Sequence, residues 1–170
     1  MCPPDDGLLP SVSDDLPPVF VDRSLAMTRT ATIKGRDYWN KLRGVRPMPM
    51  RADVVPRDMR EFLSHVGLVE IVSGANAAVD YTMRVAGGKI EEIFGSLTGQ
   101  PIAKTLPQDT AARWRLVFEE IRKGGVPLAV SGRVAYANLR HLKYELFAAP
   151  LGEDGTVSAI LGVLDIWPVT

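Results

Sequence analysis

The C-terminal third of the chain contains three successive segments with the side-chain pattern of β-strands, separated by short turns. Residues 126–137 and 142–149 alternate between apolar and other side chains, and residues 157–167 form a long apolar run. Gly152-Glu153-Asp154-Gly155 provides a tight turn between the last two. A parallel pair of strands would need a crossover of about a dozen residues or more, so strands joined this closely pair antiparallel. An antiparallel sheet is therefore the expected core.

A strongly amphipathic helix precedes these strands. Its apolar residues fall at i, i+3, i+4 and i+7: Trp114, Val117, Phe118 and Ile121. Asp109 is placed to cap its start, and Gly124-Gly125 ends it. Two strands at 66–72 and 81–86 and a short helix at 89–94 come earlier. Strands at both ends of a chain around central helices indicate an α+β fold, and we predict a five-stranded antiparallel sheet with flanking helices and the long helix at 110–123.

The N-terminal part is expected to lie outside this core. Residues 1–21 are rich in proline and aspartate and predict an extended arm. Residues 22–65 are expected to form a helical extension and a connector, with Asp22 as N-cap of a helix that reaches Arg43 and Gly35 as a candidate break within it. The core then spans 66–170.

Composition narrows the classes of function. Lysine plus arginine equals aspartate plus glutamate, at 20 each, so the chain lacks the basic excess typical of nucleic-acid binding. Cys2 is the only cysteine and can form no internal disulfide, and with two histidines it makes no zinc site. The N-terminus has no secretory pattern, and no apolar run approaches the roughly 20 residues of a membrane span. We expect a cytoplasmic protein.

The order of elements and several local motifs resemble bacterial PAS-like proteins. The motifs that carry the resemblance begin with Tyr38-Trp39, Leu42-Arg43-Gly44, Arg46, Met48-Pro49, Arg51, Asp53 and Pro56. They continue with residues 81–87, Phe94-Gly95, Leu97-Thr98-Gly99, Ala149-Pro150-Leu151 and Asp154-Gly155. The resemblance covers about residues 33–166. It implies a sensory or signalling module, and PAS domains bind flavin, haem, small acids or no ligand at all.

The sequence lacks, at the usual positions, the residues that the two common PAS cofactors, flavin and haem, would need. A photoactive flavin site needs a cysteine in the central helical region, whereas Cys2 lies in the arm. A haem site usually takes a histidine from the long helix, and residues 110–123 contain none. His65 is expected to end a helix and His141 to lie in a turn. We expect no cofactor and no metal.

The aromatic residues suggest where a ligand would bind. Candidate pocket residues are Tyr81, Met83, Phe94, Trp114, Phe118, Tyr136, Tyr144 and Trp167. They could line an apolar cavity with a few polar groups, or they could simply fill the core. Arg84 would anchor a carboxylate or phosphate if it faced this cavity. Otherwise, it would pair with Glu70, Glu145 or Asp165 on a neighbouring strand.

A second set of residues surrounds the connector: Tyr38, Trp39, Arg43, Arg51 and Asp53. These would either pin the extended segment to the sheet or shape a surface for a partner. Apolar residues in the arm and the first helix predict a homodimer, with a tail folded over its own sheet as the alternative.

The sequence thus predicts a single-domain PAS-like sensory module that binds a small molecule, a protein partner or both, and that is not an enzyme. The alternatives are a small enzyme on a similar curved scaffold, which a carboxylate beside His65 or His141 would favour, and an interaction module with a filled core.

Overall fold

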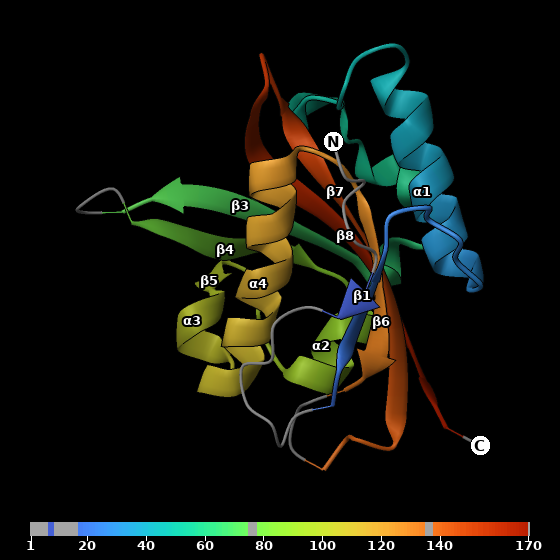
Figure 1. Cartoon of the computed structure of the whole chain (residues 1–170), viewed down its shortest axis with the longest axis vertical. Coiled ribbons are helices and arrows are strands. Elements are labelled where there is room, and N and C mark those ends of the chain that lie inside the picture. Colours follow the sequence, from blue (N-terminus) through green and yellow to red (C-terminus); the bar gives the residue numbers. More distant parts are fainter. Residues whose placement is uncertain (1–6, 9–16, 75–77, 135–137, 170) are drawn as a thin grey trace.

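A computed structural model describes residues 7–8, 17–74, 78–134 and 138–169 of the chain. Its described strands form one sheet in the order β1-β2-β6-β7-β8-β3-β4-β5, and every neighbouring pair is antiparallel (Figure 1). The five predicted strands are confirmed as β3 (Val66–Ser73), β4 (Val79–Ala86), β6 (Leu128–Arg133), β7 (Leu142–Glu153) and β8 (Thr156–Pro168). The antiparallel α+β class is therefore confirmed.

The predicted strand count of five is wrong, because the described residues form three further short strands and bring the sheet to eight: β1 (Gly7–Leu8), β2 (Val19–Asp22) and β5 (Gln100–Pro101). Two of them have only two residues, too few for any periodicity to be visible in a sequence. β2 follows prolines, which hide it, yet it pairs along β6 with Val21 opposite Val130. The arm therefore folds back onto the sheet at 19–22. The domain limits at 21/22 and 65/66 stay a prediction, and β2 crosses the first of them.

The helices are α1 (Thr30–Arg43), α2 (Gly88–Phe94), α3 (Ile102–Thr105) and α4 (Gln108–Gly124), with 3₁₀ turns η1 (Arg51–Asp53), η2 (Pro56–Met59) and η3 (Leu63–His65). The expected start at Asp22 is wrong: its carboxylate instead accepts bonds from the Ser24 and Ala26 nitrogens, which closes a turn. Asp109 is likewise no cap but a first-turn residue of α4, after the N-cap Pro107.

The central strands β7 and β8 have a helix on each side (Figure 1). α1 covers one face, where Trp39 is 2% exposed, meets Phe147 edge-on and donates from Nε1 to the Pro150 carbonyl at 2.9 Å. α4 covers the other face. Gly35 does not break α1; it lets the helix approach the sheet, since a Cβ there would lie 2.5 Å from Val163 Cγ2. Each face of β7 and β8 therefore packs against a different helix.

Candidate functional site

A cavity lies between the sheet and helices α2 and α4. Two glycines paired across β3 and β8, Gly67 and Gly162, form part of its floor. A Cβ built at either would come no closer than 3.4 Å to its neighbours, so side chains would fit at both positions and would take up part of the cavity. The volume of the cavity, taken as the space that the centre of a water molecule can reach, is about 90 Å³.

The cavity walls are apolar on both sides. α2 and α4 contribute Ile90, Phe94, Trp114, Val117 and Phe118, and the strands contribute mostly aliphatic residues and Met83. The Phe94 and Trp114 rings meet edge-on with centroids 4.8 Å apart, and Phe118 meets Trp114 at 6.4 Å. Such walls fit the apolar body of a small molecule.

The polar groups of the cavity gather at one end. Arg113 points inward from α4 and is only 8% exposed, and neither of its terminal nitrogens, Nη1 and Nη2, has a hydrogen-bond partner in the described part of the chain. Burial lowers the pKa of this guanidinium, while the nearby Tyr144 phenol opposes that shift. Burial in turn raises the pKa of Tyr144 to about 12, so the phenol keeps its proton.

Comparison with known proteins is consistent with this architecture. A family model described as "PAS domain" matches residues 27–165, more than half of the chain. The chain belongs to the PAS domain family. The PAS family supports a sensory or signalling role for the chain at this coarse level.

Other comparisons add little to this. No curated protein matches this chain. A solved structure titled "Structure of an RNA-binding Light-Oxygen-Voltage Receptor" is 16% identical, covers 59% of this chain and has a TM-score of 0.39. The match spans 29% of the length of that receptor chain.

Five of the nine candidate pocket residues line the cavity of this PAS domain: Met83, Phe94, Trp114, Phe118 and Tyr144. Tyr81 packs behind the wall, with its ring 5.3 Å from Phe118 and its hydroxyl bonded to Glu119. Trp167 is placed away from the cavity, under the Arg29 guanidinium at 4.3 Å. Tyr136 lies outside the described residues.

Arg84 does not face the cavity, so its expected role as ligand anchor has no structural basis. It is exposed and pairs with Glu70, the first of the three partners considered for it, across β3 and β4. Arg113 is the arginine that reaches the cavity. Sequence reasoning missed it, although it lies four and eight residues before Val117 and Ile121, on the buried stripe of the helix.

The connector residues make local contacts. Asp53 accepts a hydrogen bond from the Met50 nitrogen and pairs with Arg46 at 2.9 Å, and the Met50 bond contributes most to lowering its pKa. Arg43 lies over the Trp39 ring at 5.5 Å, and the Tyr38 hydroxyl accepts a hydrogen bond from the Val55 nitrogen. Arg51 is exposed. These contacts agree with a role in pinning the segment.

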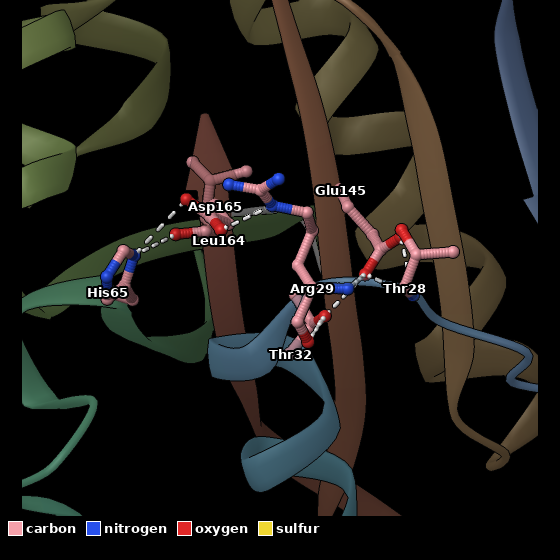
Figure 2. A network of polar contacts seen from close by, with 7 residues as sticks. All are labelled: Thr28, Arg29, Thr32, His65, Glu145, Leu164 and Asp165. Atoms are coloured by element: carbon pink, nitrogen blue, oxygen red, sulfur yellow. Dashed lines mark hydrogen bonds and ion pairs between the residues drawn. The ribbon is translucent and has the colours of Figure 1, made fainter. Parts of the chain in front are cut away.

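A polar network lies on the opposite face of the sheet, beside α1 (Figure 2). Glu145 bonds the Thr28 and Arg29 nitrogens, and Arg29 pairs with Asp165 at 2.8 Å. His65 ends η3 and donates from Nδ1 to the Leu164 carbonyl at 2.9 Å, with Asp165 at 3.9 Å. The carboxylate beside a histidine that would favour an enzyme is thus present. Neither residue lines the cavity under α4, but both line a separate pocket beside the start of α1, together with Arg29.

Neither a metal site nor a membrane-spanning helix is found in the described part of the chain. Among the described residues, no group of three or more histidine, cysteine, aspartate or glutamate side chains is arranged to hold a metal ion. No helix within the described ranges is long and apolar enough to cross a membrane.

Proposed function

We propose that this PAS domain is a sensor that binds a small molecule in the cavity between α4 and the sheet. The observation that supports this is the glycine floor: a Cβ at Gly67 or Gly162 would meet only ordinary van der Waals contacts, so the two glycines leave open a space that side chains would partly fill. Interiors are normally packed to high density, and voids larger than a water molecule are few. A partly open cavity of about 90 Å³ with apolar walls and an inward-facing arginine has the features of a ligand site.

The signal would pass through β8 to α1. Gly162, Leu164 and Ile166 line the cavity, whereas the alternate residues Val163 and Asp165 contact α1 or its N-terminal segment. A ligand that moves β8 by a fraction of an ångström would therefore directly change how α1 packs against the sheet. A protein partner that contacts α1 would read that change. The proposal includes no catalytic step.

Native mass spectrometry with a cavity-filling variant tests this function. Protein purified from its own host should carry a bound small molecule, and Gly162→Val should lose it because the valine methyl groups occupy the floor. Gly88→Val is the control, since a Cβ at Gly88 meets no atom within 4 Å and the residue lies outside the cavity. Equal ligand occupancy in Gly162→Val and the wild type would contradict the proposal.

The homodimer also stays a prediction, but its premise has changed. Val21, Met27 and Trp39, from the region expected to supply a dimer surface, are buried within one chain, while Phe20 remains 50% exposed. Light scattering of the full chain and of a chain starting at residue 31 measures the number of subunits. The cytoplasmic location, the protein partner and the absence of nucleic-acid binding likewise remain predictions.

A further inference from the structure

Arg113 is a charged side chain without a counter-charge in the described structure. Its Nη1 and Nη2 atoms are buried and make no hydrogen bond of ordinary geometry with the described residues, although the Tyr144 phenol lies near enough to raise the pKa of the guanidinium. No carboxylate is among the described residues that line the cavity. A guanidinium removed from water is strongly unfavourable unless an anion or several acceptors replace the water. The folded chain tolerates this arrangement in a place where a ligand could supply the missing acceptor.

The surroundings of Arg113 are positive as well. Arg133 also lines the cavity, and its Nη1 donates to the Arg140 carbonyl at 3.4 Å. The charge of Arg140 acts on Arg113 and lowers its pKa further. The Tyr144 phenol can also donate a hydrogen bond. The polar end of the cavity thus gathers donors and positive charge.

We propose that the cavity binds a small organic anion whose carboxylate accepts hydrogen bonds from Arg113 and whose apolar body packs against Met83, Phe94, Trp114 and Phe118. This inference rests on the proposed ligand-binding function and specifies its ligand class. The planar guanidinium fork matches the two oxygens of a carboxylate.

The size and polarity of the cavity favour a ligand with an apolar body. A volume of about 90 Å³ is well above the roughly 10–15 Å³ that a single water needs, so the cavity can hold a group of several atoms. A bare inorganic anion would satisfy Arg113 but would leave the aromatic walls uncovered. A carboxylate with a ring or a short chain would fill both parts, and benzoate is a suitable probe.

Calorimetric titration of the full chain with benzoate, benzamide and inorganic phosphate tests the inference. Benzamide has the same shape as benzoate without the charge, and phosphate has the charge without the ring. We expect benzoate to bind about tenfold or more tighter than benzamide and phosphate. Arg113→Met should weaken benzoate binding by about tenfold to hundredfold, the range for a charged hydrogen bond. Arg115→Met is the matched control, because Arg115 lies on the same helix but outside the cavity and bonds the Val79 carbonyl.

Thermal unfolding checks that Arg113→Met still folds, and Arg113→Lys should keep part of the benzoate affinity because it keeps the charge. The inference is overturned if benzoate and benzamide bind equally, if Arg113→Met leaves benzoate binding unchanged, if phosphate binds tighter than benzoate, or if neither benzoate nor straight-chain carboxylates from acetate to octanoate bind. Failure of the ligand-binding function is a different result: Gly162→Val would then leave the affinity of every bound probe unchanged.

Discussion

Glu145 in β7 accepts a hydrogen bond from the hydroxyl of Thr32 in α1, although 113 positions separate them in the chain. The same carboxylate accepts from the backbone nitrogens of Thr28 at 3.1 Å and Arg29 at 3.0 Å. The N-cap residue of α1, Arg29, makes no side-chain cap bond of its own. A strand residue therefore satisfies donors at the helix start, a role that an Asp or Ser N-cap normally plays.

Glu145→Gln should destabilise the fold by about 1–3 kcal/mol, because a neutral amide accepts fewer and weaker bonds from these donors and leaves buried groups unsatisfied. Urea unfolding followed by circular dichroism measures the change. Glu153→Gln, at the exposed end of the same strand, is the control and should stay within about 0.5 kcal/mol of the wild type. Equal stability of the two variants would contradict this role of Glu145.

Acid should weaken a second carboxylate contact, that of the half-buried Glu119 on α4. Hydrogen bonds from Arg122, and then from Tyr81, lower the pKa of Glu119 from its ordinary value of 4.5 to about 2, against the opposing effect of burial. A carboxyl with a lowered folded-state pKa stabilises the fold above its unfolded-state pKa and loses that contribution as pH falls through the folded value. The contribution of Glu119 should therefore disappear between pH 4.5 and about 2.

The measurement is the unfolding free energy as a function of pH. Glu119→Gln should flatten the curve in that window and lower stability at pH 7. Glu120→Gln, a more exposed neighbour whose carboxylate meets Arg23 at 3.3 Å, should keep more of the wild-type slope. A Glu119→Gln curve parallel to that of the wild type would show that the Tyr81–Glu119–Arg122 contact adds nothing in solution.

The main strands and α4 could be predicted because local periodicity determines them. The alternation in 142–149 and the i, i+3, i+4 stripe of 110–123 need no knowledge of the rest of the chain. β2 could not be predicted in this way, since its pairing with β6 depends on a partner more than 100 residues away. The same holds for the start of α1, because the group that caps it belongs to β7.

The candidate site was predicted in its apolar part and missed in its charged part. Aromatic residues such as Trp114 and Phe118 face inward whatever their function, so hydrophobicity alone finds them. An arginine is normally expected at the surface, and Arg113 was therefore not predicted to face the cavity. The helical stripe contained the contrary signal, but only the fold shows that the two terminal nitrogens of Arg113 are buried without a hydrogen bond to the described residues.

The purified PAS domain should be colourless. The described residues that line the cavity include neither cysteine nor histidine, the side chains that attach or ligate the common PAS chromophores, and the volume of about 90 Å³ is small for a flavin or haem ring. An absorption spectrum of protein from its own host measures this directly. A flavin band or a Soret band that persists through gel filtration would contradict the prediction and would require a larger cavity.

Gly35→Ala separates two opposing effects on α1. Alanine favours a helix interior by about 1 kcal/mol over glycine, so on helix propensity alone the variant would be more stable. Its Cβ would lie 2.5 Å from Val163 Cγ2, however, and Val163 is fully buried in β8. Overpacking of this kind costs about 1–3 kcal/mol. We expect a net loss of stability, measured by urea unfolding, and no loss in Gly88→Ala, where the added methyl meets open space.

A double-mutant cycle shows whether the loss comes from the contact between α1 and β8. Val163→Ala removes the two methyl groups that Gly35→Ala would strike, so the double variant should be more stable than the sum of the single changes by about 0.5–3 kcal/mol. Because Val163 lies between cavity residues Gly162 and Leu164, the same cycle probes the route from ligand to helix. If Gly35→Ala is more stable than the wild type, or if the two changes are additive, α1 does not pack on β8 closely enough to respond to the cavity.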